Sequence, residues 1–265
     1  MRVAAIQYDV QMGNIKENSL RAAELLHQAA ANGAELVLLP ELWNCGYLLS
    51  KLDRLAESST GPSISMLREI AAKENIFIVG GSIAEKKGND FYNTSFAIDN
   101  NGNIAQKYRK AHLFSHGLME HQYFKAGNEW GFCEFKDIKI GMTICYDLRF
   151  PEFIRNLTLR GAQIITVPAE WPLSRLREWR ILCKARAVEN SCFVISANAT
   201  DTKEKIYPGS SMIISPIGEV LAELDNRQGV ICADLDFSIC DEVKRKISVY
   251  DDRRRILDEI DDSQI

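Results

Sequence analysis

The stretch that decides the fold covers residues 138–168 and reads IKIGMTICYDLRFPEFIRNLTLRGAQIITVP. Its apolar run 138–144 predicts a strand, and the segment from about 152 to 160 predicts a helix closed by Gly161. A second apolar run, 164–167, predicts another strand that ends at a proline. A strand, a helix and a further strand in this order are typical of sheets with parallel strands and helical crossovers.

The same order continues toward the C-terminus and also occurs in the first half of the chain. In the second half we expect a helix over 174–189, a strand over 193–197 and a hairpin around Pro216-Ile217-Gly218. The first half predicts strand, helix, strand, helix, strand and hairpin over 3–8, 14–33, 35–39, 62–71, 76–79 and 92–108.

Because both halves have the same order of elements, each can form a sheet with helices on one face and an apolar surface on the other. Two such half-sheets bury their apolar faces against each other, which predicts an α/β fold, a four-layer αββα sandwich built from two similar halves. Periodicity alone leaves open one continuous, doubly wound sheet. The chain has no linker rich in Pro, Gly or Ser, so we expect a single domain over residues 1–265. The stretch 232–251 and the charged tail indicate a C-terminal extension, which we place from about residue 237.

The composition is that of an ordinary globular protein, with 46% apolar and 26% charged residues among 265. Its net charge of −4 disfavours a nucleic-acid binder, which usually carries an excess of Lys and Arg. The apolar run at the N-terminus is too short for a signal peptide, and no stretch approaches the roughly 18 apolar residues that span a membrane. We therefore expect neither a nucleic acid nor a membrane as a partner.

The seven cysteines are an odd number, so they cannot all pair within one chain. They form no Cys-x-x-Cys pair, and no histidine lies at zinc-finger spacing from them, so we expect no metal site. Most lie in apolar stretches, where a free cysteine behaves as a small hydrophobic residue. This pattern indicates a reduced protein of the cytoplasm. One question is which cysteine differs from the others, among Cys45, Cys133, Cys145, Cys183, Cys192, Cys232 and Cys240.

Three residues with reactive side chains directly follow predicted strands. Glu41 comes after the strand 35–39, Lys110 after the first hairpin, and Cys145 after the strand that opens the second half. In open α/β sheets, ligands bind beyond the carboxyl ends of the strands. A cysteine thiolate is a nucleophile, a carboxylate can take the thiol proton, and an ammonium group stabilises the negative charge that develops on an attacked amide or nitrile.

Each of these three residues also has a structural interpretation. A cysteine at a strand end commonly belongs to the core, and Glu41 after Pro40 can cap the following turn. Lys110 can belong to an exposed basic edge over 107–110. The residues alone leave open whether the three side chains meet.

Three motifs around these residues resemble the signature regions of the nitrilase superfamily of carbon–nitrogen hydrolases, and they occur in that family's order. The motifs are Leu39-Pro40-Glu41-Leu42-Trp43, Tyr108-Arg109-Lys110-Ala111-His112-Leu113 and Ile144-Cys145-Tyr146-Asp147-Leu148-Arg149-Phe150-Pro151-Glu152. The resemblance extends to about Asp236. It implies the four-layer αββα fold, no metal and no organic cofactor. It also implies a homodimer or larger homo-oligomer, often formed through the helices that follow the catalytic cysteine.

The family's Glu–Lys–Cys triad falls on Glu41, Lys110 and Cys145, and its additional glutamate falls on Glu120. The resemblance implies that Glu41 takes the proton of Cys145, whose thiolate attacks the amide carbonyl of a small-molecule substrate. Lys110 and the Tyr146 backbone N–H then stabilise the oxyanion. Ammonia leaves, and water activated by Glu41 hydrolyses the thioester. Glu120 is expected to position Lys110 or the substrate.

Two further segments, 170–180 and 112–120, resemble the omega-amidase branch. Its members hydrolyse the terminal amide of small dicarboxylate monoamides such as 2-oxoglutaramate. The free carboxylate of such a substrate needs a cationic anchor, and Arg175 is our candidate because arginine binds carboxylates bidentately. Tyr47 and Trp171 are candidate pocket walls. Alternatively, Arg175 caps or pairs on its helix surface, and Tyr47 is a packed loop aromatic.

Three other functions stay open as alternatives. Another branch of the same superfamily would act on N-carbamoyl amines or nitriles, and a protein of the same fold would bind a ligand without catalysis. A cysteine–histidine hydrolase would use His112, His116 or His121 as its base. We expect structural roles for these histidines, because the family motif gives the role of base to Glu41.

Overall fold

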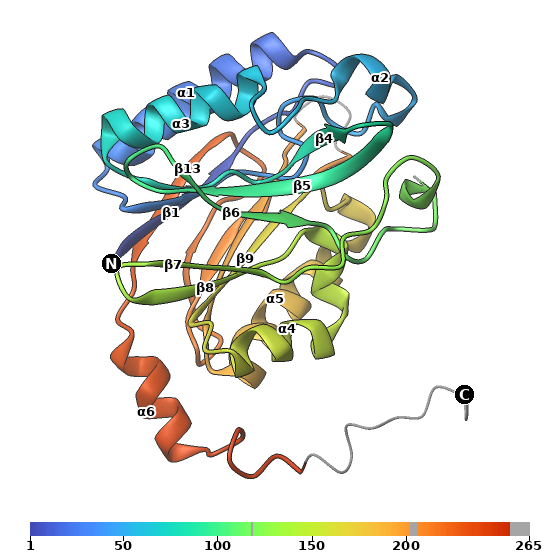
Figure 1. The fold of residues 1–265 in the computed structure, drawn as a ribbon. Helices are drawn as coiled ribbons and strands as arrows, with labels where there is room; N and C mark the ends of the chain where they lie inside the picture. The colour runs from blue at the N-terminus through green and yellow to red at the C-terminus, as the bar shows by residue number, and fades with distance from the viewer. Residues whose placement is uncertain (118, 202–205, 255–265) are drawn as a thin grey trace, which may run out of the picture.

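Two β-sheets lie face to face in the centre of the molecule, and helices cover the outer face of each sheet (Figure 1). This arrangement is the αββα sandwich expected from the duplicated order of elements, and it excludes one continuous sheet. The computed structural model describes residues 1–117, 119–201 and 206–254. Within these residues, no helix combines the length and the apolar character needed to cross a membrane.

The first sheet contains β1 (Arg2–Gln7), β2 (Leu36–Leu38), β3 (Phe77–Val79), β4 (Ile83–Lys87), β5 (Asp90–Ile98), β6 (Ile104–Arg109) and β13 (Gly229–Asp234). Its order is β13-β1-β2-β3-β5-β4, with β6 paired to β5. β1, β2 and β3 run parallel, as expected for strands joined by helical crossovers, and the others add in antiparallel pairs.

The second sheet contains β7 (Gly131–Phe135), β8 (Ile138–Met142), β9 (Ile164–Ala169), β10 (Phe193–Asn198), β11 (Met212–Ile214) and β12 (Val220–Glu223). Its order is β12-β11-β10-β9-β8-β7. β8, β9 and β10 form its parallel centre, and an antiparallel strand lies on each side. Both sheets therefore have the parallel centre and antiparallel edges that the two predicted halves require.

Helices α1 (Ile15–Ala31) and α3 (Pro62–Glu74) cover the first sheet, and α4 (Pro151–Leu159) and α5 (Leu176–Asn190) cover the second (Figure 1). The Asn14 side chain caps α1 by accepting the Glu17 N–H at 3.3 Å. The remaining helices are η1 (Leu49–Lys51), α2 (Leu52–Leu55), η2 (Glu120–Gln122), η3 (Cys145–Arg149), η4 (Leu173–Arg175) and α6 (Ser238–Lys246).

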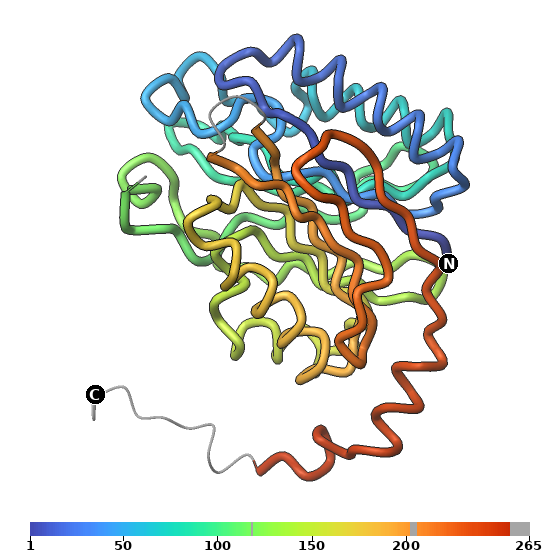
Figure 2. Tube along the Cα trace, turned by 180° about the vertical axis from the view of Figure 1, so that it is seen from behind, coloured from blue at the N-terminus to red at the C-terminus, as the bar shows by residue number. Residues whose placement is uncertain are grey.

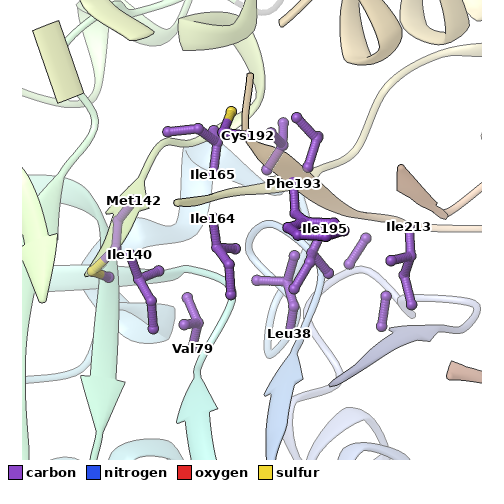
Figure 3. Close-up of a cluster of buried hydrophobic side chains, with 14 of the residues drawn as sticks. Leu38, Val79, Ile140, Met142, Ile164, Ile165, Cys192, Phe193, Ile195 and Ile213 are labelled. Carbon is purple, nitrogen blue, oxygen red and sulfur yellow. The ribbon is translucent and has the colours of Figure 1, made fainter. Parts of the chain in front are cut away.

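Alternation along the central strands separates the two faces of each sheet. In β1, Val3 and Ala5 belong to the core between the sheets, whereas Ala4 and Ile6 pack with the apolar side chains of α1 and α3. Figure 3 shows side chains that meet between the two sheets, Leu38 and Val79 from the first and Ile140, Ile164 and Ile195 from the second. The large core between the sheets fixes their relative position, and with it the position of the strand ends.

Three strands, β4, β7 and β13, are absent from the sequence-based expectations. β13 overlaps the stretch 232–251 but ends at Asp234, before residue 237, from which we place the extension. It pairs antiparallel with β1 along its whole length, and Figure 2 shows this orange-red strand beside the blue start of the chain. The alternation in β13 is weak because most of its residues are only half-buried. Its partner is also distant in sequence, so no local pattern reports this pairing.

Candidate active site

The fold brings together the residues that the sequence places at strand ends. Glu41 follows β2, Lys110 follows β6, and Cys145 opens η3 after β8. Lys110 and Cys145 line a cavity of about 340 Å³, in the range of about 300–1,000 Å³ that is typical of small-molecule sites. Glu120 begins η2, is completely buried and forms an ion pair with Lys110.

Three of the turns that carry these side chains contain a left-handed backbone conformation. The φ angles of Leu42, Met119 and Cys145 are 41°, 52° and 46°. This region is uncommon for residues with a Cβ and costs about 1–3 kcal/mol at each position. Gly81 supports the first turn, because a Cβ there would lie 1.9 Å from the Pro40 carbonyl oxygen. The surrounding structure therefore holds these turns in one conformation.

Lys110 lies between two buried carboxylates. Its Nζ is 2.8 Å from Oε1 of Glu41 and 2.9 Å from Oε1 of Glu120, and all three side chains are inaccessible to solvent. The Tyr47 hydroxyl lies 2.7 Å from the same oxygen of Glu41 and 2.8 Å from that of Glu120. A hydroxyl has one proton, so Tyr47 donates to one carboxylate at a time. Tyr47 therefore belongs to this charged cluster as well as to the cavity wall, and it is not merely a packed loop aromatic.

Glu41 is held at both carboxyl oxygens. Its Oε1 accepts hydrogen bonds from the Tyr47 hydroxyl, Lys110 Nζ and Asn93 Nδ2, the last at 2.8 Å. Its Oε2 accepts the Glu170 backbone N–H at 3.1 Å. Since three donors occupy Oε1, Oε2 is the oxygen with capacity left to take a proton.

Burial and neighbouring charges set the protonation of the site. Burial alone would raise the pKa of Glu41, but Lys110 and the Tyr47 hydroxyl bring it below its usual value. Burial raises the pKa of the Cys145 thiol well above its usual value, and the Glu41 carboxylate raises it further. Burial would lower the pKa of Lys110, whereas Glu120 and Glu41 raise it. The resting site is therefore a neutral thiol beside a carboxylate and an ammonium group.

A buried carboxylate joins the η3 turn to the segment after β6. Asp147 Oδ2 accepts the Ile144 N–H at 2.8 Å and the Tyr108 hydroxyl at 2.7 Å. Its Oδ1 accepts the His112 N–H at 3.0 Å and lies 2.7 Å from Nδ1 of the same histidine. The His112 ring also stacks on Phe150, with ring centroids 3.7 Å apart. His112 therefore has a structural role, as expected from the sequence.

We expect Asp147→Ala to lower the free energy of unfolding by about 3 kcal/mol, because two buried and two partly buried polar groups lose their shared acceptor. Tyr108→Phe removes one of these partners and should cost about 1 kcal/mol. Urea unfolding at neutral pH measures both values. Equal losses in the two variants would contradict a role for Asp147 as the shared acceptor.

All four candidate substrate-binding residues, Tyr47, Tyr146, Trp171 and Arg175, line the cavity. The Arg175 guanidinium lies 5.1 Å from the centroid of the Phe114 ring. Arg175 forms no ion pair with any residue in the described part of the chain, so the alternative of a pair on the helix surface is not supported. Its charge is thus available to a ligand in the cavity.

Sequence reasoning assigned no role to several residues of the site. Arg149 lines the cavity, with its guanidinium 4.8 Å from the Trp171 ring centroid. It lies within one of the three family motifs, but the motif alone gave it no role. Glu170 and Tyr207 also line the cavity. Asn93, in the middle of β5, contacts Glu41. Of these residues, only Arg149 could have been identified from the sequence, because it lies four residues after Cys145 on the same short helix.

The histidines differ in position. His116 is exposed and lines the cavity, and His121 is exposed. The charged groups that shift the pKa of Cys145 are Glu41, Lys110 and Glu120. This geometry favours Glu41 over a histidine as the partner of the thiol.

A family model described as carbon-nitrogen hydrolase matches residues 2–245. The chain belongs to the carbon-nitrogen hydrolase family. It is 42% identical over 257 residues to the 2-oxoglutaramate amidase of Bacillus subtilis (strain 168), covering 96% of this chain and 98% of that protein. It is 32% identical over 263 residues to an omega-amidase of Homo sapiens, covering 96% and 95%. The resemblance to the omega-amidase branch is thereby confirmed, and the chain is an amidase rather than a binding protein without activity.

The fold of this family is also found in a Glu-to-Gln variant of the amidase from Nesterenkonia sp. AN1. The TM-score is 0.85 at 26% identity, covering 97% of this chain and 95% of that one. That structure shows covalent addition of the acetamide moiety of fluoroacetamide at the active site cysteine. The likeness extends over nearly the whole length of both chains.

Proposed function

We propose that the enzyme hydrolyses the terminal amide of a small dicarboxylate monoamide of the 2-oxoglutaramate type and releases ammonia through a thioester on Cys145. The observation that carries this proposal is the cavity itself. Its wall contains the nucleophile candidate Cys145, the ammonium group of Lys110 and two guanidinium groups, Arg149 and Arg175. A substrate that carries both an amide and a free carboxylate would use both kinds of group.

In the proposed reaction, Glu41 takes the proton of the Cys145 thiol as the sulfur attacks the amide carbon. Burial and Glu41 keep the thiol neutral in the resting enzyme, so proton transfer and attack occur together rather than from a preformed thiolate. Glu41 then gives the proton to the nitrogen, the C–N bond breaks, and ammonia leaves. A water molecule deprotonated by Glu41 hydrolyses the thioester and regenerates the thiol.

Two donors stabilise the oxyanion in this scheme, Lys110 Nζ and the Tyr146 backbone N–H. The N–H groups in the first turn of a helix have no partner within that helix, and Tyr146 is the second residue of η3. Glu120 acts as a positioning residue, because its carboxylate accepts a hydrogen bond from Nζ at 2.9 Å and holds the ammonium group beside Glu41. The likeness to a structure with a covalent adduct at its active site cysteine supports the covalent route.

Arg175→Ala should lower kcat/KM for a dicarboxylate monoamide by about 10- to 100-fold, since a charge-assisted hydrogen bond contributes about 1.5–3 kcal/mol. A simple amide of the same length without a carboxylate should lose less than about threefold, because it makes no bond to this guanidinium. Arg177→Ala is the matched control, as Arg177 is exposed two residues further along the chain. Equal losses on both substrates would contradict the role of Arg175 as carboxylate anchor.

A panel of substrates tests the proposed function. It contains 2-oxoglutaramate, 2-oxosuccinamate, glutamine, N-carbamoyl amines and simple nitriles, and ammonia release is measured for each. We expect the oxo-dicarboxylate monoamides to have the highest kcat/KM. Carbon dioxide release from the carbamoyl compounds, or consumption of the nitriles at a higher kcat/KM, would instead assign the enzyme to another branch of its family.

We further propose that the enzyme works in the cytoplasm as a homodimer or larger homo-oligomer. All seven cysteines are free, as a reducing compartment would keep them. Two apolar side chains of α5, Ile181 and Val188, are 54% and 50% exposed on the outer face of the sandwich. α5 is one of the helices after Cys145, where the family resemblance places the contact between subunits.

A further inference from the structure

Glu170 directly follows β9 and forms part of the cavity wall beside the predicted triad. Its side chain is 5% exposed, and the mechanism described above uses only its backbone. That backbone N–H donates to Oε2 of Glu41, the oxygen that has capacity to take the thiol proton. A carboxyl group in this position adjoins the base of the reaction.

Among the described residues, no cationic side chain forms a hydrogen bond or ion pair with the Glu170 carboxyl group. Its Oε1 is buried without any hydrogen-bond partner there. Lys110 Nζ lies 2.8 and 2.9 Å from the carboxylates of Glu41 and Glu120 and 3.5 Å from the Tyr47 hydroxyl oxygen, so its two short bonds go to carboxylates other than Glu170. An ionised carboxylate would therefore leave a buried charged oxygen without a donor, which is costly.

The titratable groups around Glu170 come from several elements. Glu41 follows β2, Lys110 follows β6, and Tyr207 approaches from the segment before β11. An ionised Glu170 would also raise the pKa of the buried Tyr8 and Cys45 side chains. Burial raises the pKa of Glu170 well above its usual value and Glu41 raises it further, against a smaller opposing effect of a hydrogen bond with Tyr207 and of Lys110. Lys110 already faces two carboxylates, so a third negative charge would be uncompensated.

We propose that Glu170 is a further positioning residue of the amidase reaction and that it works as a neutral carboxylic acid. Its backbone N–H orients Oε2 of Glu41, and its protonated side chain forms the wall beside that carboxylate without adding a negative charge. Ionised Glu170 would oppose the transfer of negative charge onto the sulfur of Cys145. This inference rests on the proposed amidase reaction for its functional part, and on the burial of Glu170, its unpaired Oε1 and the neighbouring Glu41 carboxylate for the protonation state.

The protonation state is tested by stability, without any substrate. An unfolded glutamate loses its proton at about pH 4.3, whereas native Glu170 keeps it to higher pH. The native state then binds more protons than the unfolded state, so Glu170 lowers the stability of the wild type as the pH rises through this window. Glu170→Gln has no such proton. We expect its Tm to equal or exceed that of the wild type, with a difference that grows from about pH 5 to about pH 8.

Glu85→Gln is the control with the opposite sign. Glu85 is a buried, ionised carboxylate that accepts from Thr94, Lys107 and Arg109 at 2.9, 3.1 and 2.8 Å. Burial alone would raise the pKa of Glu85, but the bonds with Arg109 and Lys107 bring it below its usual value, so this variant should have a lower Tm at neutral pH. If Glu170→Gln behaves like Glu85→Gln, then Glu170 is ionised and the proposal is wrong.

The functional part is tested by the pH dependence of kcat/KM. At neutral pH, Glu170→Gln should keep kcat/KM within about threefold, while Glu170→Ala should lose about tenfold or more because the polar wall is gone. Once the pH is high enough to ionise Glu170, the wild type should lose activity that the Gln variant retains. Superimposable pH profiles, or equal losses in the Gln and Ala variants, would overturn the proposal. If the wild type hydrolyses no amide of the panel, the proposed function fails, and the Tm series still decides the protonation state.

Discussion

Cys145→Ala is expected to abolish ammonia release while the fold survives. The variant has no nucleophile, and removal of the nucleophile from a covalent catalytic site costs about 10⁴-fold or more in kcat. The loss of one sulfur from a half-exposed position that lines a cavity should leave the unfolding transition close to that of the wild type. Ammonia release and a urea unfolding curve on the same preparation measure both outcomes.

Cys232→Ala is the matched control, because Cys232 is the other half-exposed cysteine and lies in β13. It should keep the activity of the wild type. Cys145→Ser is a less clean variant, since a hydroxyl can retain weak reactivity. Alkylation by an amide reagent such as iodoacetamide gives a second readout. Glu41 can take the proton as the Cys145 sulfur attacks, so Cys145 should react before the other six cysteines, which mass spectrometry of the peptides reveals. Equal labelling of Cys45 and Cys145 would weaken the case for a specially placed thiol.

Lys110→Met should lower the activity by more than about 10³-fold and also destabilise the protein. The activity falls because an oxyanion donor alone contributes about 10²–10³-fold and the substitution also removes the neighbour that keeps Glu41 ionised. The stability falls by about 3–5 kcal/mol at neutral pH, because Glu41 and Glu120 are left as buried carboxylates without a counter-charge. Ammonia assays and urea unfolding measure the two effects.

The loss of stability in Lys110→Met should shrink as the pH falls. Without the ammonium group, the pKa of the carboxylate pair rises, so the native state of the variant takes up a proton that the wild type does not. Lys107→Met is the control, since Lys107 lies three residues earlier and its pair with Glu85 is partly exposed. It should cost less than about 1 kcal/mol. A loss in Lys110→Met that does not depend on pH would contradict the charge balance described for the site.

The layered fold follows from sequence because its signals are local. The runs that became β2, β9 and β10 are buried on both faces, and the parallel centre of the first sheet is bounded by helix signals such as Asn14 and Pro62. β13 was missed because its pairing with β1 joins the two ends of the chain. β4 is a short strand that ends in two exposed lysines, and β7 has only five residues, so the alternation of its buried and less buried positions is too short to stand out.

The site was predictable where its residues lie at strand ends within a family motif, as Glu41, Lys110 and Cys145 do. Tyr47 was placed in the cavity wall, but its bond to the two glutamates depends on an approach of loops that no spacing encodes. The same holds for Asn93, which reaches Glu41 from the neighbouring strand. The left-handed turns at Leu42, Met119 and Cys145 occur at residues with no preference for that conformation, so composition gives no warning of them.

The central claim is that hydrolysis passes through a thioester on Cys145, and trapping by hydroxylamine tests it most directly. The wild type is incubated with 2-oxoglutaramate and increasing hydroxylamine, and ammonia, free acid and hydroxamate are measured together. We predict that hydroxamate forms at the expense of free acid, that their sum equals the ammonia released, and that Cys145→Ala forms neither. Ammonia release without any hydroxamate, or hydroxamate formation by the Cys145→Ala variant, would contradict this claim.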